Sequence, residues 1–161
     1  MDNRALILIN GLELSPHPEG GYYKEIYRSE TTVHSPHAGA MRHALTDIYF
    51  LLLSGQVSRL HRVLHDEIWH LYEGAPLVLV EIAANGMEMG EVRLEGCGPT
   101  PKYTHCVKGG NWQAAYSTGE YTLVGCTVAP GFAFDDFRFL SQEAELQSIV
   151  FEKFPGVSHL L

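Results

Sequence analysis

A histidine and a glutamate that could exchange a proton or bind a metal stand six residues apart near the middle of the chain. These are His61 and Glu67, within the segment GQVSRLHRVLHDEIWHLYEG of residues 55–74. In a β-strand, side chains two residues apart share a face, so His61 and Val63 should point the same way, with Glu67 joining them from the next strand. Two histidines and a carboxylate arranged in this way, joined by a later histidine, form a typical first-row transition-metal site. Because residue 63 is a valine, one such ligand is missing.

The elements that must position these residues are predicted to be short strands. Many short strands, separated by Gly, Pro, Asn and Ser clusters, predict a sandwich or barrel. The strands do not alternate with helices, so a parallel sheet is not expected. The predicted strands span residues 22–28, 46–53, 57–63, 67–72, 76–83, 89–95, 103–107, 112–116, 120–129 and 136–140.

Two short helices are expected at the ends of this run. Residues 3–12 place Leu6 and Ile9 on one helical face, and residues 142–154 form an amphipathic pattern with Ser141 as N-cap. The polar segment 29–44 is expected to be a loop. We therefore expect one all-β domain over 1–161, with its barrel at about 22–140.

Composition agrees with a single globular domain. The chain has 161 residues, 45% of them apolar, and its formal charge of −8 argues against nucleic-acid binding, which needs basic patches. No apolar run is long enough to span a membrane, and the N-terminus lacks the features of a signal peptide. The three cysteines form no metal-binding or disulfide pattern, so a cytoplasmic protein with reduced thiols is expected.

The spacing of Gly55, His61, Glu67 and Gly74 is similar to the first motif of the cupins, G-x5-H-x-H-x3-E-x6-G, with Val63 at the second histidine. The second cupin motif, G-x5-P-x-G-x2-H-x3-N, is best matched around Gly110, which places Gln113 at its histidine position. The resemblance thus implies a double-stranded β-helix, that is, a jelly-roll barrel. Of the four metal-ligand positions, only His61 and Glu67 keep a usual ligand type.

Longer segments resemble one cupin subfamily that has no firmly assigned activity. They follow in the expected order over nearly the whole chain: HPEGGYYKEIYRS (17–29), TDIYFLLLSG (46–55), HRVLHDEIWHLYEG (61–74), GGNWQAA (109–115) and LVGCTVAPGFAFDDFRF (123–139). Its members resemble in fold the dTDP-4-dehydrorhamnose 3,5-epimerases (the RmlC-like jelly roll), metal-free cupins that use a barrel-lining histidine as base.

Four residues are candidates for the site. The resemblance implies that His61 is the general base, since imidazole titrates near neutrality. Glu67 and Gln113, at motif positions, would contact a substrate, and Trp69 would line the cavity because it shares the face of Glu67 in a regular strand. Two of them have a structural alternative: His61 as a core histidine satisfied by a carbonyl, and Glu67 as a partner of His61 or of a neighbouring arginine. The epimerases also imply a tyrosine acid, for which the sequence offers Tyr49, Tyr72, Tyr103, Tyr116 and Tyr121.

Three further segments have open interpretations. The loop with His17 and Glu19 is read mainly as a glycine turn, although it could cover a barrel mouth. His65 and Asp66 are expected in a solvated turn. His70 is expected on the outside of the barrel, and Phe132 or Phe134 could narrow a cavity.

These observations predict a small-molecule-binding cupin. It would be a metal-independent epimerase or isomerase acting on a sugar-like or other carbonyl-bearing substrate; the alternatives are a non-catalytic binding or sensor protein and a metal-dependent oxygenase. No cofactor is expected, apart from a divalent metal at His61 and Glu67 under the last alternative. The resemblance also implies a homodimer. The net charge and the short apolar runs predict no nucleic-acid or membrane partner.

Overall fold

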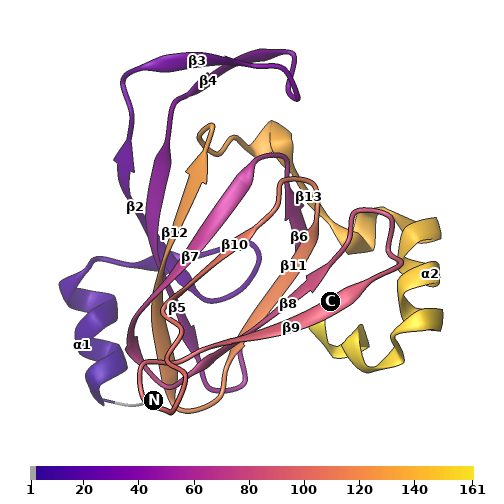
Figure 1. The fold of residues 1–161 in the computed structure, drawn as a ribbon. Helices are drawn as coiled ribbons and strands as arrows, with labels where there is room; N and C mark the ends of the chain where they lie inside the picture. The colour runs from indigo at the N-terminus through magenta and orange to yellow at the C-terminus, as the bar shows by residue number, and fades with distance from the viewer. Residues whose placement is uncertain (1–2) are drawn as a thin grey trace.

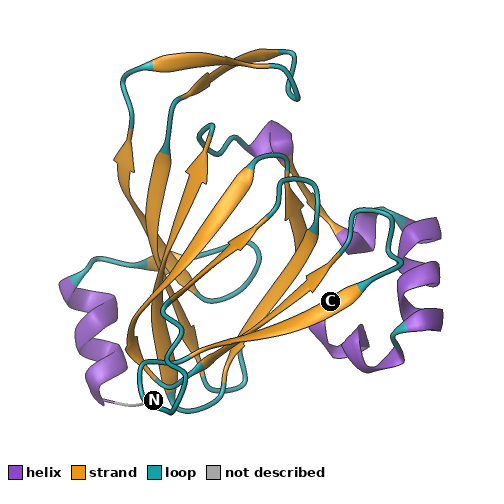
Figure 2. Cartoon of the chain, in the orientation of Figure 1, coloured by secondary structure: helices purple, strands orange, loops and turns teal. Residues whose placement is uncertain are grey.

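The computed structural model describes residues 3–161 and contains two antiparallel sheets that face each other (Figure 1). The first sheet has the order β1 (Ser15–Pro16), β2 (Tyr22–Arg28), β5 (Thr46–Leu53), β12 (Tyr121–Ala129), β7 (Asp66–Gly74) and β10 (Thr104–Val107). The second has the order β13 (Phe137–Phe139), β6 (Val57–Val63), β11 (Trp112–Ser117), β8 (Leu77–Ile82) and β9 (Met89–Leu94). The expected all-β jelly roll with short flanking helices is confirmed (Figure 2).

Strand alternation divides the apolar side chains between the inside and the outside of this sandwich. On β5, Phe50 and Leu52 face the second sheet, whereas Leu51 and Leu53 belong to a separate cluster on the outer face. The inner cluster joins residues from both sheets: Phe50, Leu52, Trp69, Leu77, Leu79, Leu94, Val107, Ala115, Val124 and Cys126.

The outer faces are covered by helices. Helix α1 (Asn3–Gly11) packs Ala5 and Leu8 against Leu51, Leu53 and Leu123 of the first sheet. Helix α2 (Ala144–Lys153) and the 3-10 segment Pro155–Leu160 cover the second sheet (Figure 1). The α2 helix begins two residues later than the sequence predicts, because Leu140–Gln142 form a 3-10 turn. Glu143 precedes the helix, so the N-cap role expected for Ser141 is wrong.

The polar segment between β2 and β5 is a hairpin and not the predicted loop. Strands β3 (Thr32–Ser35) and β4 (Ala40–His43) pair antiparallel and extend beyond the end of the two sheets (Figure 1). Arg42 binds the carboxylate of Asp136 through two nitrogens, at 2.7 and 2.8 Å. Bidentate pairing of this kind ties the hairpin to the short 3-10 turn Phe134–Asp136.

His65 provides the second attachment of the hairpin. Its Nε2 lies 2.7 Å from the hydroxyl of Ser35, and both side chains are buried. The expectation that His65 lies in a solvated turn is therefore wrong: the hairpin, which the sequence reading did not contain, covers it. Within residues 3–161, no helix has the length and apolar character needed to cross a bilayer.

Candidate functional site

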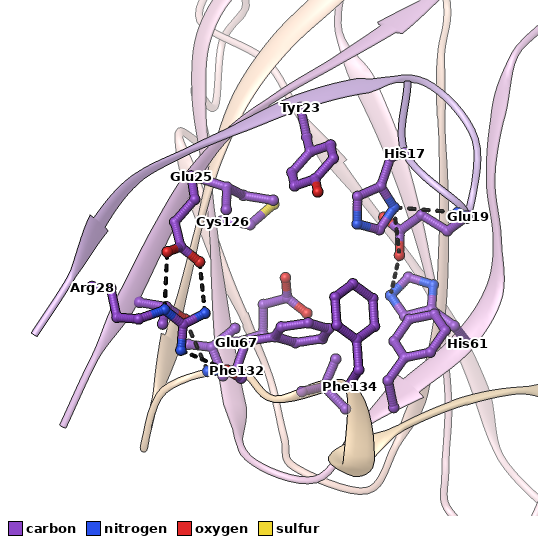
Figure 3. A pocket seen from close by; sticks show the side chains of 15 residues that line it. His17, Glu19, Tyr23, Glu25, Arg28, His61, Glu67, Cys126, Phe132 and Phe134 are labelled. Atoms are coloured by element: carbon purple, nitrogen blue, oxygen red, sulfur yellow. Dashed lines mark hydrogen bonds and ion pairs between the residues drawn. The ribbon is translucent and has the colours of Figure 1, made fainter. Parts of the chain in front are cut away.

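A cavity of about 290 Å³ is lined by residues of both sheets, from β2, β5, β12 and β7 of the first sheet and from β6 and β13 of the second. Figure 3 shows the side chains that line it. Polar and titratable side chains line one part, and apolar side chains line the rest. The polar and titratable residues of this lining are His17, Glu19, Tyr23, Glu25, Arg28, Thr46, His61, Glu67 and Cys126. The apolar ones are Ile48, Val63, Val128, Phe132, Phe134 and Phe137.

The two ring nitrogens of His61, a residue of β6, face different groups. Nδ1 faces a backbone carbonyl, and Nε2 faces polar side chains at the cavity. Its Nδ1 lies 2.7 Å from the carbonyl oxygen of Arg59, so Nδ1 carries the proton and donates it. Its ring stacks on Phe137 at 5.2 Å between centroids. Burial lowers the pKa of His61, so the ring is neutral near pH 7 and Nε2 offers a lone pair.

Gln113 of β11 fixes this tautomer from the other side. The indole Nε1 of Trp69 can only donate, and it donates to Oε1 of Gln113 at 2.9 Å. The amide nitrogen of Gln113 must therefore face the opposite way, where it donates to Glu67 and lies 3.2 Å from Nε2 of His61. Since that nitrogen is a donor, Nε2 of His61 acts as an acceptor, in agreement with the Arg59 contact.

Glu67 of β7 is a buried carboxyl group that changes charge near neutrality. Its side chain is about 7% exposed, and burial raises its pKa to about 7, with the nearby Glu19 acting in the same direction. The buried thiol of Cys126, whose own pKa burial also raises, lies beside it. Glu67 can therefore hold or release a proton at physiological pH.

Glu19 is the second buried carboxyl group, and it comes from the loop before β2. One of its oxygens lies 3.2 Å from Nε2 of His61, and the other accepts a 3.0 Å hydrogen bond from Ser58. Burial raises the pKa of Glu19, as it does that of Glu67. Gly20, at φ +112°, lets the loop pass so close to β6 that any side chain there would strike the carbonyl of Val57.

His17 and Tyr23 form the wall across from Glu67. Nδ1 of His17 accepts the backbone N–H of Glu19 at 3.2 Å, and its ring meets Tyr23 edge to face at 4.4 Å between centroids. The Tyr23 hydroxyl and the Glu67 carboxyl point toward each other across the open centre of the pocket (Figure 3).

A salt bridge and two aromatic rings lie at the other side of the cavity. Arg28 binds both carboxylate oxygens of Glu25, at 2.7 and 2.9 Å, and donates to the carbonyl of Phe132. Phe132 and Phe134 contact edge to face, and Phe134 is 62% exposed although it lines the cavity. This segment therefore borders the route from solvent to the cavity.

The structure brings the four sequence-predicted site residues together in one hydrogen-bonded group, but at two depths. His61 and Glu67 line the cavity, whereas Trp69 and Gln113, each about 1% exposed, lie behind them. Trp69 is part of the inner core and does not form the cavity wall that was expected of it. Phe132, Phe134 and Phe137 form the aromatic wall of the cavity.

Sequence reasoning did not find the other polar groups of the cavity. His17 and Glu19 line it, although the loop was read mainly as a turn, and none of the five proposed acid tyrosines reaches it. The tyrosine in the cavity is Tyr23, whose place on β2 opposite Phe50 puts it on the inner face. The alternation of Tyr23 and Glu25 was the available signal. His70 does lie outside the cavity lining, near Thr127 and stacked on Tyr72.

The donor atoms here do not fit the metal site of the cupin motif. Val63 occupies the second histidine position and Gln113, whose amide is a poor metal ligand, occupies the later one, so two of the four ligand positions lack a usual ligand type. Within residues 3–161, no three His, Cys, Asp or Glu side chains are placed to hold a metal ion.

Comparisons with known proteins agree with the fold. A solved structure of protein SO0799 from Shewanella oneidensis is similar, with 36% identity, 99% of this chain and 98% of that chain covered, and a TM-score of 0.83. "Uncharacterized protein YML079W" of Saccharomyces cerevisiae is 30% identical over 89% of this chain and 78% of its own length. An uncharacterized conserved protein with a double-stranded β-helix domain from Klebsiella pneumoniae shares the fold, at 13% identity and a TM-score of 0.54 over 80% of this chain and 91% of that chain.

The family model described as the Cupin superfamily (DUF985) matches residues 7–140, which include both sheets and every polar residue of the cavity. This chain therefore belongs to the DUF985 family of the cupin superfamily.

Proposed function

We propose that the protein is a metal-independent epimerase or isomerase that moves a proton next to the carbonyl group of a small, sugar-like substrate. The observation that carries the proposal is the fixed tautomer of His61: Arg59 and Gln113 together leave its Nε2 as a proton acceptor. Arg59 acts through its backbone carbonyl, so the arrangement does not depend on the identity of its side chain.

The cavity supplies both halves of a proton transfer. Nε2 of His61 takes the proton from the carbon beside the carbonyl, and Glu19, 3.2 Å away, stabilises the imidazolium that forms. Both contacts to Nε2 are 3.2 Å long, and catalytic hydrogen bonds are commonly long before substrate binds. Tyr23, whose hydroxyl lies across the centre of the cavity from Glu67, is assigned to return a proton to the other face of the carbon. Glu67 would serve as a substrate contact that titrates near neutrality.

The size of the cavity limits the substrate. A volume of about 290 Å³ lies at the lower end of ligand pockets, which suits a monosaccharide-sized compound better than a complete nucleotide sugar. Phe132, Phe134 and Phe137 supply apolar surface for the less polar face of such a ligand.

The test is solvent deuterium exchange. Wild-type protein in D₂O, incubated with a panel of neutral aldoses and ketoses, should incorporate deuterium beside the carbonyl, as followed by ¹H NMR. His61→Ala should abolish the exchange, while His159→Ala, which changes an exposed histidine far from the cavity lining, should not. Equal exchange in wild type and His61→Ala would refute the proposal.

A binding or sensor role without chemistry is the second candidate, favoured by the aromatic part of the lining. Tight binding of a panel compound without any exchange would support it. An oxygenase is not proposed, because the donor set does not fit a metal.

We further propose that the protein is a homodimer. Ile68 and Tyr72 on β7 and Tyr27 on β2 are large side chains, 38 to 54% exposed, on the first sheet. Covering such side chains is a common reason for association. Light scattering that finds a monomer at micromolar concentration would contradict this.

A further inference from the structure

The two histidines of the cavity are held in opposite tautomers. Nδ1 of His17 accepts the backbone N–H of Glu19 at 3.2 Å, and a backbone amide can act only as a donor. Neutral His17 therefore carries its proton on Nε2. His61 is the reverse case, because its Nδ1 donates to the carbonyl of Arg59 and its Nε2 accepts.

His17 is neutral and its N–H is directed at the open space. Burial lowers its pKa, and its side chain is about 8% exposed. Its Nε2 edge points away from Glu19 toward the centre of the pocket (Figure 3). Among the described residues, no hydrogen bond to this nitrogen is found, so the donor is available to a ligand.

We propose that His17 is the catalytic electrophile of this cavity, donating its Nε2–H to the carbonyl oxygen of an uncharged hydroxycarbonyl substrate. This inference rests on the proposed proton transfer and names a further residue and the substrate class for it. As His61 removes the proton, the C–H electrons form a carbon–carbon double bond and the carbonyl π electrons move to oxygen. The N–H of His17 stabilises the charge on that oxygen, and a neutral imidazole can do this without transferring its proton.

The charges around the cavity indicate that the reacting part of the substrate is uncharged. Glu19 and Glu67 are both buried beside His61, so an anionic group there would meet two carboxyl groups. Among the cavity-lining residues of the described chain, Arg28 is the one permanent cation, and Glu25 binds it through two bonds. Like-charge proximity in a buried site is strongly unfavourable, which selects against carboxylate substrates.

The first test reads the tautomers directly. Long-range ¹H–¹⁵N NMR of ¹⁵N-labelled protein at neutral pH should show His17 protonated on Nε2 and His61 protonated on Nδ1, with assignments from His17→Gln and His61→Ala. A His17 signal with the proton on Nδ1 would overturn this inference while leaving the proposed function intact.

The second test uses dihydroxyacetone and hydroxypyruvate, two hydroxyketones that differ in a hydroxymethyl group and a carboxylate. Wild type should exchange the dihydroxyacetone C–H with D₂O faster than that of hydroxypyruvate. His17→Phe should lower kcat for dihydroxyacetone by about 10²-fold with little change in KM, which is the usual effect of removing one such donor. His17→Gln, which returns an N–H near the same position, should have a kcat for dihydroxyacetone at least about tenfold higher than that of His17→Phe. Thermal unfolding of both variants establishes that they are folded.

The outcomes are separable. Wild-type exchange that His17→Phe leaves unchanged would refute the role of His17 but not that of His61. Faster exchange of hydroxypyruvate would refute the uncharged substrate class. Absence of exchange with either compound would count against the proposed function and this inference together.

Discussion

The indole nitrogen of Trp69 and the amide oxygen of Gln113, 2.9 Å apart, together determine which way the Gln113 amide faces. Because that amide nitrogen contacts both Glu67 and His61, a side chain that does not line the cavity orients a donor toward two that do. Trp69 is thus a positioning residue for the proposed reaction.

Trp69→Phe should release the Gln113 amide. Without the indole donor, Oε1 of Gln113 lacks its buried partner, so we expect a loss of about 1–3 kcal/mol in unfolding free energy. The amide can then rotate, and the NMR signals of His61 should show a mixture of tautomers. Urea unfolding and ¹H–¹⁵N spectra measure the two effects; a variant of lower stability with an unchanged His61 tautomer would show that Trp69 is merely structural.

Tyr23→Phe separates proton removal from proton return. The hydroxyl is proposed to act on the face of the substrate opposite His61, so its loss should leave deuterium exchange within about tenfold of wild type while inversion falls by about 10²-fold or more. Chiral chromatography of the products measures inversion, and NMR measures exchange. Parallel loss of both would mean that Tyr23 is not a separate acid.

Glu67→Gln should change how stability depends on pH. The pKa of Glu67 is raised to about 7 from an ordinary value of 4.5, so the folded state holds its proton more tightly than the unfolded state does. The stabilisation of the folded state that comes from the protonated Glu67 carboxyl group is therefore present in full below pH 4.5 and is lost as pH rises through about 7.

The unfolding free energies of Glu67→Gln and wild type are compared at pH 5 and at pH 8. The value for the variant minus the value for wild type should be about 1–3 kcal/mol larger at pH 8 than at pH 5. His17 and His61, whose pKa values are lowered, contribute in the opposite direction, with stability lost as pH falls below 6.5. The difference between wild type and variant cancels the contribution of His17. The contribution of His61 changes, because the Glu67 charge that raises its pKa is removed. Parallel pH profiles of the two proteins in urea unfolding would contradict the raised pKa.

The sequence spacing of the motifs predicted the central part of the site, because in a strand the spacing of two residues determines whether their side chains share a face. His61 and Gln113 are direct partners across β6 and β11, and both were found from their motif positions. Spacing does not give depth along the barrel, however, so Trp69 was expected in the wall and lies in the core. Val63 and Gln113 occupy two of the four ligand positions of the motif, and the expectation of a metal-free cavity stays a prediction.

Residues brought in by loops could not be found in the same way. Glu19 reaches His61 because its loop packs against β6, with the N–H of Arg59 donating to the carbonyl of Glu19. Nothing in the local pattern of residues 15–21 shows that contact. The β3–β4 hairpin was missed for a similar reason: its strands pair only with each other, so polar residues occupy most positions and no apolar alternation marks it.

Gly20→Ala should displace the loop that carries His17 and Glu19. A Cβ at this position would lie 2.1 Å from the carbonyl oxygen of Val57, at a φ of +112° that disfavours any side chain. We expect a loss of at least about 2 kcal/mol in stability and of most exchange activity.

Gly39→Ala is the matched control, since its φ is also positive, at +60°, but a Cβ there meets nothing within 4 Å. It should lose about 1 kcal/mol and keep its activity. Equal effects of the two substitutions would contradict a specific role for the loop.

Restoring two histidines should create the metal site that the motif describes. Val63→His adds the missing ligand beside His61, and Gln113→His replaces the amide that donates to Nε2 of His61 with a group that can bind a metal. The double variant should retain about one equivalent of Ni²⁺ or Co²⁺ after dialysis, measured by inductively coupled plasma mass spectrometry, and bound Co²⁺ should give visible absorption. Wild type treated in parallel should retain far less than one equivalent. Since Gln113 is not a usual metal ligand, Val63→His alone should bind more weakly than the double variant. Stoichiometric metal in wild type would show that the cavity accepts a metal despite Val63, and the proposed chemistry would then have to include one.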